Sequence, residues 1–155
     1  MTAQAAKTHY TPAEVFIATG ISVPKQNQWY DRRTIKPSRL DKQPAGSGNY
    51  RLVCAATIYQ IAITATCVNL GIPARQAAEA ARLFAVDQSD RPANTLYPFD
   101  RTLLLVKATG TQIIKADFNA SLTDICGRPF EAAIIVDIGQ IVRSVDQEIS
   151  KKAYQ

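Results

Sequence analysis

The sequence predicts a mainly α-helical N-terminal part followed by a small α/β unit of three strands and one helix. Helix start and stop signals recur through the first half of the chain, whereas short apolar runs separated by turns follow in the last third. Between them, residues 87–100 carry Ser, Asp, Asn and two prolines, a composition typical of a linker. With 155 residues, the chain has room for one domain or two small ones.

The first predicted helix begins at Pro12 and ends at Thr19. Thr11 offers a hydroxyl at the N-cap, and Glu14 stands three residues later, which together form a capping box. Pro12 occupies the first helical position, where its missing N–H costs nothing. Gly20 suits the left-handed conformation that ends a helix.

A second helix is predicted over residues 23–33, with Ser22 as its cap and Pro24 confined to the first turn. Its spacing turns Trp29 and Tyr30 inward, and core packing is favoured over base stacking for Trp29. Arg and Lys pair with guanine edges or phosphates, while Asn and Gln bond adenine in the major groove. Such side chains form the outward face: Lys25, Asn27, Gln28 and Arg32.

The next segment, residues 35–51, predicts a wing: two short extended arms with a flexible Gly-Ser-Gly-Asn tip at 46–49. Residues 20–52 hold seven basic residues against two acidic ones, a surplus equal to the net charge of +5 of the whole chain. Clustered cations favour a phosphate backbone as partner, although a solvated hairpin is the simpler alternative. The predicted DNA-binding residues are Ser22, Lys25, Asn27, Gln28, Arg32, Arg33, Lys36, Arg39, Lys42 and Arg51. Arg51 has a second interpretation, a structural pair with Asp31 or Glu14.

The residues 10–15 (YTPAEV), 20–22 (GIS), 29–32 (WYDR), 49–51 (NYR) and 70–73 (LGIP) resemble the MerR-type winged helix-turn-helix over roughly residues 8–86. The resemblance implies a helix-turn-helix, a wing and two further helices in a dimeric bacterial transcription regulator. The same helix-turn-helix is similar to that of phage excisionases, which bind and bend DNA. The chain departs from these families at two positions. Gln26 replaces an apolar packing residue, and Leu52-Val53-Cys54 replaces a polar cap.

An uncharged helix is predicted over residues 54–69, inside a stretch from Leu52 to Ala74 that carries no charge. Its polar residues and the break at Gly71 and Pro73 disfavour a membrane span. A helix without solvating charges is expected to be covered on two sides. We expect it to pack on the winged helix with one face, and on the C-terminal segment or a second subunit with the other. A fourth helix should run from Ala74 to about Val86.

The C-terminal unit is predicted from five elements. Strands are expected at 103–107, 111–118 and 131–137, with a helical turn at 121–125 and a closing amphipathic helix over 138–151. Three strands and one helix enclose little by themselves, so the unit is expected to dock on the long helix or on its copy in a dimer. The predicted organisation is a flexible N-terminus (1–9), a DNA-binding domain (10–86), a linker (87–100) and a dimerisation or regulatory unit (101–155).

Several function classes are disfavoured. His9 is the only histidine, and the three cysteines lack C-x-x-C spacing, so we expect buried thiols and neither a metal site nor a cofactor. Asp117, Asp124 and Asp137 are interpreted as caps and turn residues, and we expect no catalytic residues. No signal-peptide pattern opens the chain, so a cytoplasmic, nucleoid-associated location is expected, in a bacterium or its mobile elements.

Three hypotheses follow from the sequence. The leading one is a sequence-specific DNA-binding transcription regulator that acts as a dimer and contacts its partner through helix 54–69 and the C-terminal unit. The second is an excisionase-like architectural protein that directs recombination. The third is a ligand-binding or enzymatic α/β unit tethered to DNA by the N-terminal part.

Overall fold

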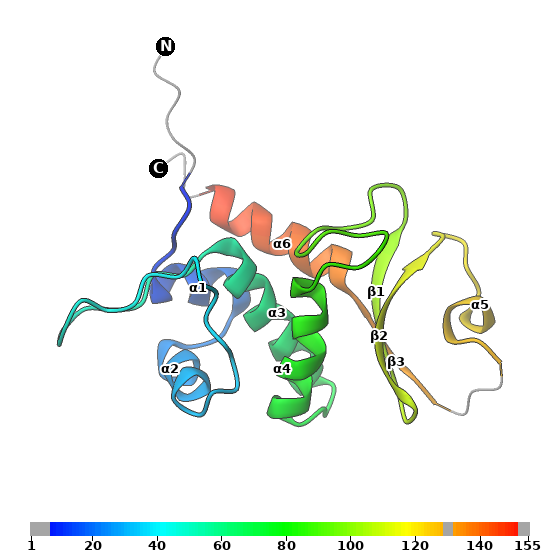
Figure 1. Ribbon diagram of the computed structural model, residues 1–155, viewed down its shortest axis with the longest axis horizontal. Coiled ribbons are helices and arrows are strands. Elements are labelled where there is room, and N and C mark those ends of the chain that lie inside the picture. Colours follow the sequence, from blue (N-terminus) through cyan, green and yellow to red (C-terminus); the bar gives the residue numbers. More distant parts are fainter. Residues whose placement is uncertain (1–6, 129–131, 152–155) are drawn as a thin grey trace, which may run out of the picture.

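A computed structural model describes residues 7–128 and 132–151, which form a mixed α/β fold with six α-helices, one 3-10 helix and a three-stranded antiparallel sheet (Figure 1). Helices gather on one side of the sheet, and one short helix lies on the other. In chain order the elements are α1 (Pro12–Thr19), α2 (Val23–Asp31), α3 (Ala55–Asn69), α4 (Ala74–Arg82), η1 (Leu83–Ala85), β1 (Arg101–Lys107), β2 (Gly110–Ala116), α5 (Leu122–Cys126), β3 (Ile134–Asp137) and α6 (Ile138–Lys151).

The signals that begin and end α1 act as predicted. Thr11 and Glu14 form both halves of the capping box, and Gly20 ends the helix with φ +73°. Helix α2 ends at Asp31, two residues earlier than predicted. Arg33 adopts φ +54°, a conformation that cannot continue the helix. Ser22 precedes α2, but its hydroxyl makes no capping hydrogen bond, which corrects the role expected for it.

Helix α3 is the central helix, and its own chain covers it. It contacts α1, α4 and α6, which bury Thr57, Gln60 and Thr64 together with its aliphatic residues. Of the two covers expected for its second face, the structure therefore has the C-terminal segment in place of a second subunit. The partner contact expected through residues 54–69 stays a prediction, although most of this helix is buried within its own chain. Within the described ranges, no helix is both long and apolar enough to cross a membrane.

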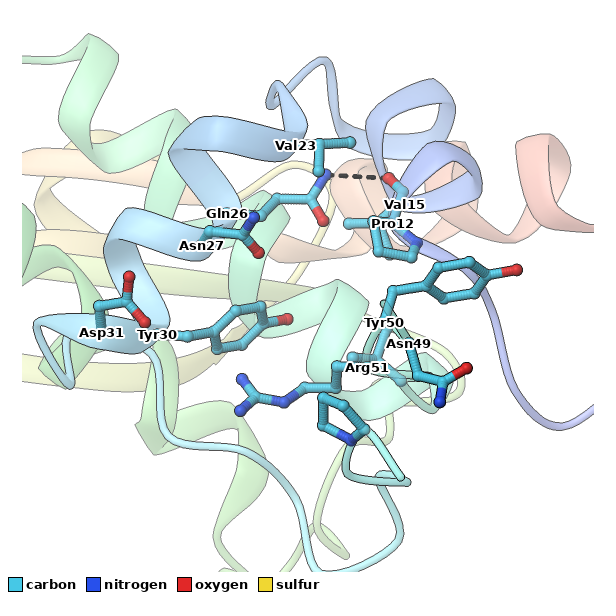
Figure 2. A pocket seen from close by; sticks show the side chains of 12 residues that line it. Pro12, Val15, Val23, Gln26, Asn27, Tyr30, Asp31, Asn49, Tyr50 and Arg51 are labelled. Carbon is cyan, nitrogen blue, oxygen red and sulfur yellow. Dashed lines mark hydrogen bonds between the residues drawn. The ribbon is translucent and has the colours of Figure 1, made fainter. Parts of the chain in front are cut away.

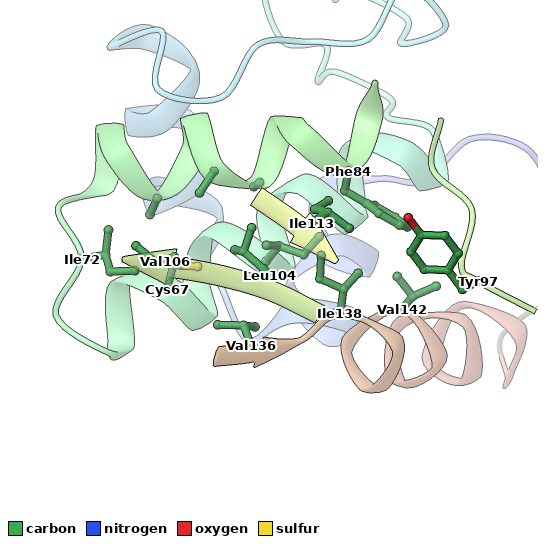
Figure 3. Packing of buried hydrophobic residues seen from close by; sticks show 14 residues of the cluster. Cys67, Ile72, Phe84, Tyr97, Leu104, Val106, Ile113, Val136, Ile138 and Val142 are labelled. Carbon is green, nitrogen blue, oxygen red and sulfur yellow. The ribbon is translucent and has the colours of Figure 1, made fainter. Parts of the chain in front are cut away.

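The sheet has the strand order β2-β1-β3, and its central strand is the most buried. Leu104 and Val106 face the helices in a cluster that Figure 3 shows from close by. Leu103 and Leu105 face the opposite way, toward α5. The three strands lie where the sequence placed them, with ends shifted by up to three residues. Of the third predicted strand, 131–137, position 131 lies outside the described residues.

Helix α6 joins the two main cores. Its Val142 belongs to the cluster under the sheet, while Val145, one turn later, belongs to the cluster around α1 and α2. A hydrogen bond of 2.6 Å from the Tyr59 hydroxyl to Asp146 Oδ1 ties α6 to α3. The last helix of the predicted C-terminal unit thus packs on the N-terminal helices, as the crossing of α6 beside α1 and α3 in Figure 1 shows.

Residues 87–100 contain a feature that sequence reasoning did not anticipate. Arg91 is 1% exposed, and its guanidinium carbon lies 5.0 Å from the centre of the Phe84 ring. The guanidinium donates hydrogen bonds of 3.0–3.3 Å to five backbone carbonyls, those of Leu83, Phe84, Val86, Pro92 and Thr95. A single buried side chain therefore organises a segment whose composition indicates a linker.

We predict that Arg91→Met lowers the free energy of unfolding by about 3 kcal/mol or more, because five backbone carbonyls around the buried guanidinium lose a hydrogen-bond donor. Urea unfolding followed by circular dichroism measures the change. Arg75→Met is the matched control, since that side chain is 91% exposed and should change stability by about 0.5 kcal/mol or less. Equal effects of the two substitutions would contradict the organising role of Arg91.

Candidate nucleic-acid interface

Helix α2 is seated by two side chains on its inner face. Trp29 is 3% exposed in the core, as predicted, and Gln26 is 2% exposed. The Gln26 side-chain amide donates to the carbonyls of Pro12, at 3.0 Å, and Ile21, at 2.7 Å; Figure 2 shows the first bond. The amide therefore substitutes for an apolar packing residue, because it satisfies two carbonyls around the turn between α1 and α2.

The opposite face of α2 is polar. Asn27 and Lys25 are exposed, and Gln28 is half-buried. Lys25 Nζ donates to Gln28 Oε1 at 3.0 Å, which holds these two side chains together on the surface. Asp31 is exposed on the same face at helical spacing from Asn27 and Gln28, so an acid accompanies the predicted base-reading residues. The exposed hydroxyl of Ser22 lies just before the first turn.

The segment predicted as a wing is a projecting loop closed by one pair of residues. Lys42 and Leu52 exchange backbone hydrogen bonds of 2.8 and 3.0 Å. Over 35–51 the structure has this isolated bridge where two extended arms were expected. Gly46 and Gly48 both take positive φ in the loop tip, which extends away from the helices in Figure 1.

The basic residues around α2 have no acidic partners. Within the described residues there are six ion pairs, and all of them lie before residue 15 or after residue 74. Every predicted contact residue of the loop except Arg51 is exposed: Arg32, Arg33, Lys36, Arg39 and Lys42. The positive charge of residues 20–52 therefore has no ion-pair partner among the described residues and is available to an external anion.

Asp41 anchors this basic loop to α3. Its Oδ1 accepts from the backbone N–H of Cys54 at 2.9 Å, and its Oδ2 accepts from the Thr57 hydroxyl at 2.7 Å. The Ser38 N–H donates to Oδ2 as well, at 2.9 Å. A carboxylate at the start of a helix satisfies free N–H groups and the helix dipole. The residues directly before α3 provide no side-chain cap, and Asp41, which lies earlier in the sequence, provides one instead.

Arg51 takes neither of the acidic partners expected for a structural pair. Its guanidinium carbon lies 4.1 Å from the centre of the Tyr30 ring, and Nη2 donates to Gln43 Oε1 at 3.0 Å. Glu14 is instead paired with Lys7 and bonded to the backbone N–H of Thr11. Sequence reasoning missed Tyr30 and Gln43, because the stack joins residues from two different elements.

The stacked Tyr30 and Arg51 line a cavity of about 250 Å³ between α2 and the loop, shown in Figure 2. Burial raises the pKa of Tyr30 to about 12, against the opposing effect of the Arg51 guanidinium, so its hydroxyl stays protonated at neutral pH. Neither the Tyr30 hydroxyl nor Arg51 Nη1 has a hydrogen-bond partner within the described residues. Both atoms are buried, and the stack holds the guanidinium of Arg51 beside α2.

The remaining chemically interesting side chains have local structural roles. Asp124 forms a capping box with Ser121, and Asp137 accepts from the Gln140 N–H at the start of α6, as predicted for caps. All three cysteines are buried and free. Over 7–128 and 132–151, no group of three or more His, Cys, Asp or Glu side chains is placed to hold a metal ion.

Comparison with known proteins finds no family model and no curated protein that matches this chain. The resemblance to MerR-type regulators therefore remains a prediction that depends on the quoted motifs.

We predict that Asp41→Ala lowers the free energy of unfolding by about 1–2 kcal/mol, because α3 loses its cap and the basic loop loses its anchor. Thermal or urea unfolding measures the loss. Asp31→Ala is the matched control, because Asp31 is exposed and makes no ion pair in the described residues. If both substitutions have the same effect, Asp41 is not the cap of α3.

Proposed function

We propose that this chain is a sequence-specific DNA-binding transcription regulator that acts as a dimer. In this proposal α2 enters the major groove and loop 35–51 lies on the phosphate backbone. The observation that carries the proposal is the set of exposed cations in residues 20–52, none of which forms an ion pair with an acid in residues 7–128 or 132–151. A nucleic acid binds to unpaired surface cations through its phosphates, and a polar helix face beside them can contact its base edges.

The order of the elements supports this assignment of roles. Helix α1, the turn at Gly20 and helix α2 follow one another as in a helix-turn-helix, and the inner face of α2 is fixed by Trp29 and Gln26. The nine residues of α2 span about 14 Å, a length suited to the major groove. With its inner side buried, α2 leaves Lys25, Asn27 and Gln28 for base edges or nearby phosphates.

The loop residues supply the second part of the proposed interface. Lys36, Arg39 and Lys42 stand on a loop that Asp41 holds against the start of α3, so their backbone positions are fixed relative to α2. Arg51, at the end of the loop, is held against Tyr30 of α2 by the stack of its guanidinium on the ring. Phosphate contacts from such residues set the register, whereas the α2 side chains specify sequence.

A dimer is part of the proposal because one short recognition helix reads few base pairs. Two copies would place two α2 helices on half-sites about one helical turn apart. Since α3 is covered by its own chain, the contact between copies is assigned to another surface.

Binding should depend steeply on salt. A DNA duplex selected from a random library with the full-length protein serves as the ligand, and the slope of log K against log [salt] is expected at about −0.9 per neutralised phosphate. Lys36→Ala and Arg39→Ala should each make the slope shallower by about 0.9, since both side chains are exposed and unpaired. Arg75→Ala, an exposed cation of α4, is the control that leaves the slope unchanged. A flat slope for the unaltered protein would overturn the proposal.

Asn27→Ala should change specificity without changing the salt slope. Asn27 is an exposed, uncharged residue of α2, so its loss should remove discrimination at one base pair, about 1–3 kcal/mol, and no phosphate contact. Repeating the selection with the variant measures the preference at each position. Ser47→Ala, in the loop tip, is a control expected to keep the selected sequence. An unchanged consensus for Asn27→Ala would remove α2 from the base-reading role.

A further inference from the structure

A second cavity lies between the helices and the sheet, apart from the basic loop. It has a volume of about 750 Å³ and is formed by the α3–α4 turn, the β1–β2 turn and residues 132–134 at the start of β3. Figure 1 shows the two turns next to each other at the lower edge of the molecule. Volumes of about 300 to 1,000 Å³ are typical of small-molecule sites.

The cleft continues the main hydrophobic core toward solvent. Ile72 and Val106 lie at one end of the cluster between helices and sheet, and Phe84 and Tyr97 at the other, as Figure 3 shows. Both Ile72 and Val106 also line the cleft, so they separate it from the closed core. Leu70 stands at the rim and is 52% exposed, a considerable apolar surface for one side chain.

Among the residues that the structure describes, the lining is mainly apolar, and its one charged residue is Lys107. The Lys107 ammonium donates to the Cys126 carbonyl at 3.0 Å, toward α5. Alternation along β1 agrees with this direction, because Leu103 and Leu105 face α5 while Val106 faces the cleft side. The charged group found in the described lining is therefore directed toward α5 and not into the cleft. Gln76 of α4 is the polar side chain on the helical wall.

We propose that this cleft binds a neutral, mainly apolar small molecule, with a hydrogen-bonding group directed to Gln76. A charged ligand would lose its hydration without gaining a counter-charge, whereas an apolar one would cover Leu70 and the adjoining aliphatic surface. The inference does not rest on DNA binding and is tested without DNA.

The probe is N-phenyl-1-naphthylamine, a neutral dye whose fluorescence rises in apolar surroundings, titrated into the full-length protein. We expect a saturable rise with one dye per chain. Neutral 1-decanol should displace the dye, while decanoate and decylammonium, used below their micelle concentrations, should be at least about tenfold weaker. Absence of saturable binding, or equal displacement by the charged analogues, overturns the proposal.

Substitutions at matched positions locate the site. Leu70→Asp should weaken dye binding at least about tenfold, because it places a carboxylate on the rim of the cleft. Leu122→Asp is the control, since Leu122 is 62% exposed on α5 and does not line the cleft; binding should stay within about twofold. Thr109→Trp, at the opposite rim, should weaken binding by filling space without adding charge. Circular dichroism verifies that each variant folds. Equal effects of Leu70→Asp and Leu122→Asp overturn the assignment.

Discussion

The burial of an uncharged helix by its own chain is the constraint on which the rest of this structure depends. Helix α3 carries no charged side chain, so each of its faces has to be covered. Its neighbours α1, α4 and α6 come from three separate parts of the sequence and meet on it. Buried hydroxyls do not oppose this packing, because Thr64 donates to the Gln60 carbonyl at 2.7 Å within the helix itself.

In this arrangement the basic segment between α2 and α3 lies outside the hydrophobic core that surrounds α3. The segment between α2 and α3 contributes little to the core, with Ile35 and Val53 as its buried aliphatic residues. Its single half-buried acid, Asp41, is used to cap α3, and so it does not neutralise the neighbouring cations. The loop can therefore be anchored firmly at one point while its charges remain available. The stack of Arg51 on Tyr30 adds a second attachment, between the loop and α2.

Helix α6 connects the core under the sheet with the core around α1 and α2. Val142 packs under the sheet and Val145 packs against the cluster that seats α1 and α2. The proposed ligand cleft is bounded by the turn that ends α3, and α3 in turn contacts α1. A neutral ligand in the cleft and a nucleic acid at α2 would thus contact elements that share one packed helix. Energetic coupling between the two proposed sites would require that helix α3 has two discrete arrangements.

The sequence by itself determined the local elements, because caps, glycine stops and apolar periodicity act within a few residues. It predicted the capping box at Thr11, the stop at Gly20, the three strands and the helix over 138–151. It also identified the basic segment, since charge is visible without a fold. Side-chain partners far apart in the chain were decided by the tertiary structure: Asp41 with α3, Arg51 with Tyr30, and α6 in place of a second subunit. Arg91 was missed for the same reason, because the carbonyls that accept its hydrogen bonds converge only when the chain folds back. Spacing along a sequence carries no record of such pairings, whereas packing and hydrogen-bond satisfaction select them.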